Sequence, residues 1–217
     1  ARMLLVATDL GVVESAALAA AVISEKDFIR PAPGSGESRP QRIDADLEWR
    51  LEVLADRTSL PGSFDIDRNA VRRVFDVQRQ LLAILGKRAR PSSKPGGGRS
   101  LRQALLAAFP DRVCCRRSYE RSGSYTICTG QGFVISENGL LPGEQLILAL
   151  RLDQSQRAGD GRIFLACALE ESLLADQHLY QRRRELFFSR LHSRVTARER
   201  VFYGKLILRE NETAVRS

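Results

Sequence analysis

The hydrophobic period of the sequence changes once, near Pro110, and this change constrains the fold more than any other feature. Ahead of it, apolar residues recur at intervals of four, four and three, at Ile43, Leu47, Leu51 and Leu54, which places them on one helical face. Beyond it, leucines at every second position from 146 to 152 are typical of a strand. We therefore expect an α+β chain, with an N-terminal all-α helical domain over residues 1–109 and a small β-domain over residues 110–217.

The first half of the chain has the composition and spacing of five helices. They are expected at residues 3–10, 14–24 and 43–54, between Asp67 and Gly86, and at residues 100–109. Asp67 is a good N-cap, and Gly86 can end the helix that begins there. Two segments rich in Pro, Gly and Ser interrupt the pattern. Residues 30–41 are expected to be a mobile loop, and residues 87–99 a flexible basic linker.

The second half is predicted to form a small closed or nearly closed barrel. Strands are expected at residues 125–129, 133–136, 146–152, 162–169, 186–191, 194–203 and 205–208, with a short helix at residues 170–178. Gly130-Gln131-Gly132 lacks the third glycine and the following helix of a dinucleotide site. Both glycines are therefore expected to turn a hairpin, because glycine reaches positive φ at little steric cost.

The charge balance indicates an anionic partner. The chain of 217 residues has a net charge of +8 and an isoelectric point near 9.8, and a basic surface attracts polyanions such as RNA or DNA. A membrane surface is the rival partner, but the sequence has no strong basic amphipathic helix. The four cysteines lack C-x-x-C spacing and lie far in sequence from the two histidines. No metal site is expected, and reduced thiols indicate a cytoplasmic protein.

The candidate nucleic-acid-binding residues are a set of cations and one ring. Period two places Arg194, Arg198 and Arg200 on one face of a strand whose other face is apolar. A groove that follows a single strand combines several cations with exposed rings. We expect phosphate contacts from Arg116, Arg117, Arg194, Arg198 and Lys205, and base stacking on Tyr125. The alternatives are that the basic face is merely solvated and balanced by acids such as Glu199, and that the rings belong to the core.

No catalytic site is expected in this chain. Two histidines leave little choice of general base for a nucleophilic enzyme. The glycine-rich segment at residues 96–100 lacks Walker A spacing, and no Asp-Glu-Ala-His box occurs. The phosphates of ATP and its magnesium ion therefore lack their usual ligands, so the chain alone is not expected to hydrolyse ATP.

Three stretches resemble the C-terminal accessory region of the HrpB-type DEAH-box helicases of bacteria. They are ARMLLVATDLG with LAAAVISEKD and DLEWRLEVL, then ALLAAFPDRV with YTICTGQGF, and finally RVTARERVFYGKLILRE. The resemblance implies a helical ratchet-type domain followed by an OB-like barrel. It also implies that the chain helps to enclose single-stranded nucleic acid, RNA rather than DNA, beside two RecA-like motor lobes of the same polypeptide. ATP and magnesium would bind in those lobes, with no cofactor here.

A different hypothesis, an interaction module, remains open at this point. In it, the barrel docks on the motor lobes or on a partner protein and has little direct contact with nucleic acid.

Overall fold

A computed structural model of the chain describes residues 1–32, 46–56, 60, 62, 64–86, 97–117, 122–135, 141–153, 159–189 and 194–214. Helices are found where the sequence predicts them: α1 (Arg2–Asp9), α2 (Val13–Ser24), α3 (Leu47–Leu54), α4 (Arg68–Leu85) and α5 (Gly98–Ala108). Asp67 caps α4 by accepting hydrogen bonds from the backbone N–H groups of Asn69 and Ala70. Residues 43–45 and most of the two expected loops lie outside the described residues.

The expectation of an all-α N-terminal half is wrong. Strand β1 (Ile29–Pro31) pairs antiparallel with β2 (Phe64–Ile66), so that Ile29 lies opposite Ile66. Arg30 and Pro31, which were assigned to a mobile loop, belong to this pair, and Arg30 forms an ion pair with Asp65 at 2.8 Å. The local composition is rich in turn residues, but buried Phe28 and Ile29 hold the segment against the helices. Residues 33–41 are outside the described residues.

Five short strands form a closed barrel, which the sequence predicts, although no strand is expected from it before residue 125. They are β3 (Val113–Arg116), β4 (Ser124–Ile127), β5 (Gly132–Val134), β6 (Leu146–Asp153) and β7 (Gly161–Ala168). Their order is β3-β4-β5-β7-β6, and β3 closes the barrel by pairing with β6. β5 and β7 run parallel, whereas every other pair in the barrel is antiparallel. Inward-facing apolar residues, among them Tyr125 and Phe133, fill the interior.

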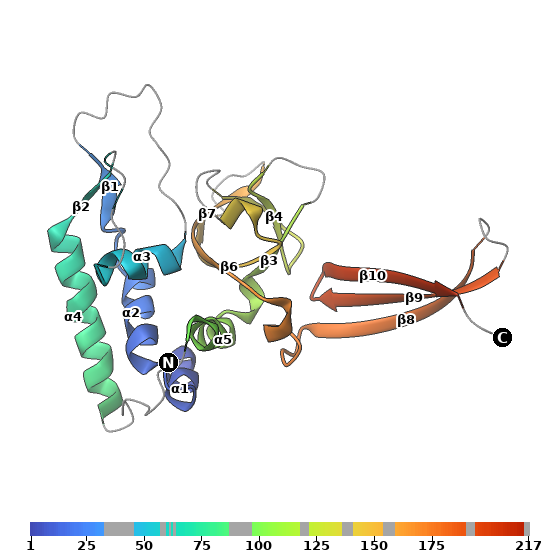
Figure 1. The fold of residues 1–217 in the computed structure, drawn as a ribbon, viewed down its shortest axis with the longest axis horizontal. Coiled ribbons are helices and arrows are strands. Elements are labelled where there is room, and N and C mark those ends of the chain that lie inside the picture. Colours follow the sequence, from blue (N-terminus) through green and yellow to red (C-terminus); the bar gives the residue numbers. More distant parts are fainter. Residues whose placement is uncertain are drawn as a thin grey trace.

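The last three strands are not part of the barrel, and this corrects the sequence-based prediction. β8 (Tyr180–Ser189), β9 (Arg194–Tyr203) and β10 (Leu206–Ala214) form their own antiparallel sheet. This sheet projects away from the barrel on the side opposite α4 (Figure 1). Because β3 pairs with β6, the barrel has no open edge to which β8 could add. The helix expected at residues 170–178 is also wrong, since only a 3-10 turn, η4 (Glu171–Leu173), forms there.

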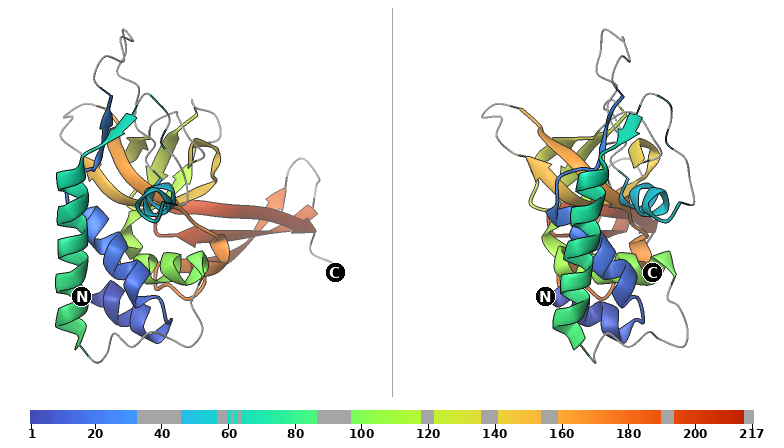
Figure 2. Two further views of the ribbon diagram at one scale, coloured as in Figure 1. Left: turned by 60° about the vertical axis from the view of Figure 1, so that its left-hand side comes forward. Right: turned by 90° about the vertical axis from the view of Figure 1, so that its left-hand side faces the viewer.

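One apolar cluster joins the helices, the outside of the barrel and the base of the projecting sheet. It includes Ala16 and Leu105 from the helices, Leu148 and Cys167 from the barrel, and Tyr203 from β9. Figure 2 shows α4 along the outer edge of the helical part, with the barrel and the sheet beyond α2 and α5. The described helices therefore pack against the β6–β7 side of the barrel, and none of them packs extensively on its β4–β5 side.

Candidate nucleic-acid interface

The β4–β5 hairpin confirms one of the two expected glycine roles. Gly130 has φ +96°, and its N–H donates to the carbonyl of Ile127 at 2.7 Å, which closes the turn. Gly132 does not have a positive φ, so its expected role is wrong. A Cβ at Gly132 would instead overlap the side chains of Arg117 and Asp160. The second glycine is therefore needed for close approach of these side chains to the backbone.

Arg117 lies across the outer face of this hairpin. Its Nε donates to Thr126 Oγ1 at 3.0 Å, and its two Nη atoms donate to the carboxylate of Asp160 at 3.0 and 3.1 Å. Both side chains of the ion pair are partly exposed. The charge of Arg117 is thus balanced by an internal carboxylate, which weakens its expected role as a phosphate contact.

Replacing Gly132 with alanine is expected to lower the free energy of unfolding by about 1 kcal/mol, the upper range for a partly exposed ion pair. The new Cβ meets the ends of flexible side chains, so Arg117 and Asp160 can move apart while the backbone stays in place. Urea denaturation measures the change. A loss above about 3 kcal/mol, typical of core disruption, would contradict this explanation.

Arg116 is the neighbouring expected phosphate contact, and it differs from Arg117. Its Nη1 donates to the carbonyl of Gly143 at 3.0 Å, in the turn that precedes β6. Among the described residues, no carboxylate forms an ion pair with Arg116. Its positive charge therefore remains available to an anionic ligand.

Tyr125 cannot stack on a base, which corrects the sequence-based prediction. The ring is completely buried inside the barrel, and its hydroxyl lies within hydrogen-bonding distance of the Leu141 and Glu144 carbonyls. Burial raises the pKa of this hydroxyl. Phe133 and Tyr203, the other rings considered from the sequence, are buried as well. The alternative that these rings are core is correct.

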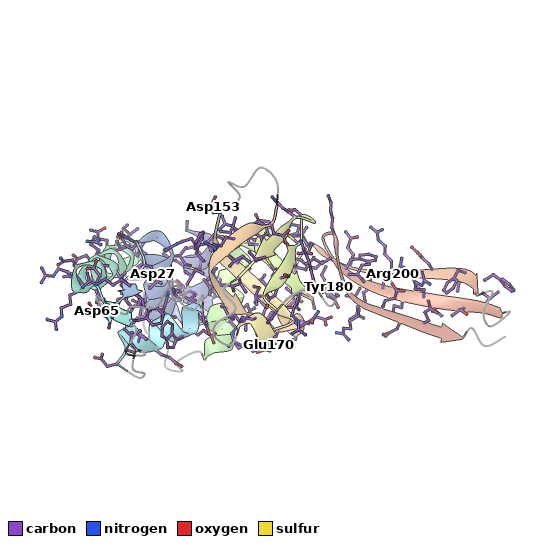
Figure 3. All side chains as sticks on the ribbon, turned by 90° about the horizontal axis from the view of Figure 1, so that it is seen from above. Asp27, Asp65, Asp153, Glu170, Tyr180 and Arg200 are labelled. Carbon is purple, nitrogen blue, oxygen red and sulfur yellow. The ribbon has the colours of Figure 1, made fainter. Side chains whose placement is uncertain are left out.

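Arg198 lies on the projecting sheet rather than on the barrel. It forms ion pairs with Glu212 at 2.7 Å and Glu210 at 3.3 Å, and its guanidinium lies 4.3 Å from the centre of the Phe187 ring. Arg200 pairs with Glu210 in the same row. Figure 3 shows Arg200 out on the sheet, beyond Tyr180 at the sheet's base and away from Asp153 on the barrel. The backbone of Arg194 begins β9, but its side chain lies outside what the structure describes.

Lys205 lies in the turn between β9 and β10, and this turn packs against the β4–β5 hairpin. Gly204, with φ +58°, turns β9 into β10, and the next N–H, that of Lys205, donates to the carbonyl of Cys128 at 2.8 Å. The Lys205 side chain lies against Gly130, where an added Cβ would be 3.1 Å from Lys205 Cδ. The structure therefore brings Lys205 and Arg117 to one hairpin, and separates both from Arg198.

Sequence reasoning missed two residues on this side of the barrel. Arg162 of β7 is exposed and lies beside Val134 of β5, and Phe164 is 43% exposed. The Arg162 guanidinium is 5.9 Å from the centre of the Phe164 ring. The β6–β7 register shifts at Phe164, and such a bulge can turn a side chain outward. The alternation of Arg162, Ile163 and Phe164 was the available signal, but the segment was interpreted as a continuous apolar strand.

These residues define a surface that we call the outer hairpin face. It consists of Arg117, Thr126, Gly132, Val134, Arg162, Phe164 and Lys205. Lys205 and Arg162 have no ion-pair partner within the described part of the chain, and Phe164 offers an exposed ring beside one of them. Cations beside an exposed ring are the groups that a single strand of nucleic acid requires.

Much of the remaining positive charge has a structural role. Arg151 of β6 donates to the carbonyls of Val22 and Ile23 at the end of α2, at 2.9 and 3.0 Å. Its pKa is lowered by desolvation, yet the negative end of the helix favours a cation there. Arg102 of α5 forms a two-pronged ion pair with Glu48 of α3, which raises its pKa. Net charge therefore overstates the cationic surface available to a ligand.

The fold of this chain, with helices on one side of a five-stranded barrel, is similar to a part of solved helicase structures. Two of the solved structures that match are of HrpB from E. coli. One, described as a DExH-box NTPase, covers 99% of this chain with a TM-score of 0.63 and 23% identity. The other, described as a DEAH/RHA helicase, covers 95% with a TM-score of 0.58 and 21% identity. The resemblance to HrpB-type helicases is thus confirmed at the level of the fold.

This chain spans 22% of the length of each HrpB chain. No family model matches it, and no curated protein sequence matches it significantly. Within the described residues, none of the helices combines the length and the apolar character needed to cross a membrane. The same residues contain no group of three or more His, Cys, Asp or Glu side chains placed to hold a metal ion.

Proposed function

We propose that this chain is an accessory region of an ATP-dependent helicase, and that its barrel holds single-stranded RNA for a RecA-like motor in the same polypeptide. ATP hydrolysis belongs to the motor, which binds the nucleotide and magnesium. The chain's own contribution is to bind and orient the strand. The similarity of the whole fold to part of HrpB supports the accessory role.

The observation that carries the proposal is the barrel topology together with its uncovered face. A five-stranded barrel with this strand order and a parallel pair between its third and fifth strands fits an OB-fold. OB-folds bind oligonucleotides on the face of their second and third strands, which correspond here to β4 and β5. That face is the outer hairpin face, and the helices cover a different side.

Four side chains of the outer hairpin face, and Arg116 beside it, have a proposed role. Lys205 and Arg162 contact phosphates, because neither has an internal ion-pair partner in the described chain. Phe164 stacks on a base. Arg117 contributes less, since Asp160 already balances its charge, and Arg116 extends the cationic surface at the far end of β3. The proposal thus replaces Tyr125 by Phe164 as the stacking ring.

The test is titration of a fluorescein-labelled single-stranded RNA with the 217-residue chain at several salt concentrations. We expect weak binding whose log affinity falls linearly with log salt, by about 0.7 for each phosphate contact. Lys205→Ala and Arg162→Ala should each reduce this slope by about 0.7. Phe164→Ala should weaken binding about tenfold, because stacking on one ring contributes about 1–3 kcal/mol.

Matched controls lie on α4, away from the barrel. Arg72→Ala removes an exposed cation. Phe75→Ala removes a ring whose exposed fraction, 37%, is similar to the 43% of Phe164. Both should leave RNA affinity within about twofold. Absence of binding even at low salt would overturn the proposal and favour docking on the motor lobes. Equal losses for the α4 and barrel variants would reduce it to non-specific charge attraction.

A further inference from the structure

The two faces of the projecting sheet differ in whether their side chains find partners within the sheet. One face carries Arg198 and Arg200, which pair with Glu210 and Glu212 of β10. On the same face, the Phe187 ring lies beneath the guanidinium of Arg198, and the Phe202 ring lies beneath that of Arg183. Most of the polar and aromatic groups in this part of the face are therefore partnered within the sheet itself. We call it the paired face.

The opposite face leaves a contiguous apolar cluster in solvent. Leu186 and Phe188 of β8 are 66% and 62% exposed, and Val195 of β9 is 48% exposed. Phe188 lies directly opposite Val195, and Leu186 lies opposite Ala197, so the three side chains are neighbours on one surface. We call this surface the open face, and it also includes Arg182 and Arg184. Clusters of this kind on soluble proteins mark interaction sites.

The base and the end of the sheet are supported differently. At the base, Tyr203 and Leu206 are buried in the apolar cluster shared with the barrel. The part that carries Leu186 and Phe188 projects beyond that cluster (Figure 1). A sheet ordinarily buries one face against a second layer, most often a helix or another sheet. Among the described residues, no helix or second sheet covers the apolar side chains of the open face.

The charges beside the cluster indicate the chemistry of the missing layer. Arg182 and Arg184 are exposed on the open face, on the barrel side of Leu186. Glu199 lies opposite Arg184 in register, yet these two described side chains form no ion pair. The guanidinium of Arg182 lies 5.9 Å from the centre of the Tyr180 ring, and no carboxylate among the described residues forms an ion pair with it. A partner that covers the apolar cluster thus gains by placing carboxylates over these two arginines.

We propose that the open face docks an acidic amphipathic helix of a partner protein. Apolar residues of the helix cover Leu186, Phe188 and Val195, while its carboxylates reach Arg182 and Arg184. From Arg182 to Phe188 the strand extends about 20 Å, which an α-helix spans in about 13 residues. This inference goes beyond the proposed function, because it uses none of the barrel residues assigned to RNA.

The same observations disfavour two other occupants. A second copy of the chain packed face to face would present the same arginine-rich surface, and so would not supply the excess of carboxylates that Arg182 and Arg184 favour. Nucleic acid gains most from rings on which bases stack, whereas two of the three side chains in the cluster, Leu186 and Val195, are aliphatic. An acidic apolar helix satisfies both the charge and the chemistry of the patch.

The test measures fluorescence anisotropy of a labelled 14-residue peptide as the 217-residue chain is added. The peptide carries leucines along one helical face and glutamates on its flanks. We expect saturable binding, weakened at least about tenfold by Phe188→Ser or Leu186→Ser, as for residues at the centre of an interface. The matched control is Ile207→Ser, because Ile207 is 49% exposed on the paired face. It should change affinity by less than about twofold.

A separate set of substitutions that remove or reverse charges tests the role of the arginines. Arg184→Gln should weaken binding of the acidic peptide, whereas Arg183→Gln on the paired face should not. Arg184→Glu should bind a version of the peptide with lysines in place of glutamates more tightly than the natural chain does. Circular dichroism of each variant establishes that the sheet is intact, which is expected because all the substituted residues are exposed.

Four outcomes would overturn the proposal. One is no binding at about 1 mM peptide, the weak end of specific association. Another is equal binding of a scrambled peptide with the same composition. A concentration-dependent dimer that Phe188→Ser abolishes, seen by sedimentation, would assign the face to a second copy. Loss of RNA affinity in Phe188→Ser comparable to that in Phe164→Ala would assign it to nucleic acid. Because the RNA and peptide tests use different residues, either proposal can fail while the other stands.

Discussion

Replacing Gly204 with alanine is expected to loosen the projecting sheet from the barrel and to lower the free energy of unfolding by about 3 kcal/mol. Two costs add. A residue with a side chain is strained at φ +58°, and a Cβ there would lie 2.7 Å from the carbonyl oxygen of Cys128. That carbonyl accepts the Lys205 N–H at the junction of sheet and barrel. Urea denaturation gives the stability change.

Hydrogen exchange locates the effect of the Gly204 substitution. Amides of β8, β9 and β10 should exchange faster, while those of the barrel interior should change little. Gly143→Ala is the control, because an added Cβ there meets nothing within 4 Å and its φ is not positive. It should alter stability by less than about 0.5 kcal/mol. Faster exchange throughout the barrel would show that the turn stabilises the whole molecule rather than the junction.

Replacing Asp27 with alanine is expected to destabilise the chain by about 3 kcal/mol, since it leaves a buried charge without its carboxylate. Arg50 has a side chain only 2% exposed, and its Nη2 lies 2.7 Å from Asp27 Oδ2. The hydrogen bond that Arg50 donates to the Asp46 carbonyl would remain, but a neutral carbonyl does not neutralise the guanidinium. Thermal and urea denaturation measure the loss.

Removing the charges of both Asp27 and Arg50 tests whether the lost stability comes from an unpaired buried charge or from a general loss of contacts. The double variant Asp27→Ala with Arg50→Met should recover much of the stability, because an apolar side chain of similar length needs no carboxylate. Asp65→Ala is the matched control, since its ion pair with Arg30 is well exposed. It should cost far less stability than Asp27→Ala, because solvent screens an exposed ion pair. Equal losses at Asp27 and Asp65 would refute the argument from burial.

Local features of the sequence were sufficient to predict the five helices of the first half. Asp67 and Gly86 bound α4 as expected, because a cap and a helix-ending glycine act through neighbouring backbone groups. The closed barrel also followed from the alternation of apolar residues. The β1–β2 pair did not, since Ile29 and Ile66 are far apart in sequence and the pairing depends on the helices between them.

The candidate site was predicted less well than the fold. Lys205 is on the outer hairpin face and remains a candidate. Tyr125 failed because an alternating pattern does not reveal which of its two faces points into a barrel. Arg117 and Arg198 were correctly placed near surfaces, but their partners, Asp160 and Glu212, come from other strands.

The sequence by itself determined the five helices of the first half, the residues that bound α4 and the hairpin turn at Gly130. These depend on interactions between residues that are close along the chain. Only the tertiary structure decided which strands close the barrel, which rings are buried and which cations keep a free charge. A guanidinium is neutralised by a carboxylate within about 4 Å, and that distance is set by packing between distant segments. The proposed phosphate contacts are therefore Lys205 and Arg162, because neither forms an ion pair within the described part of the chain.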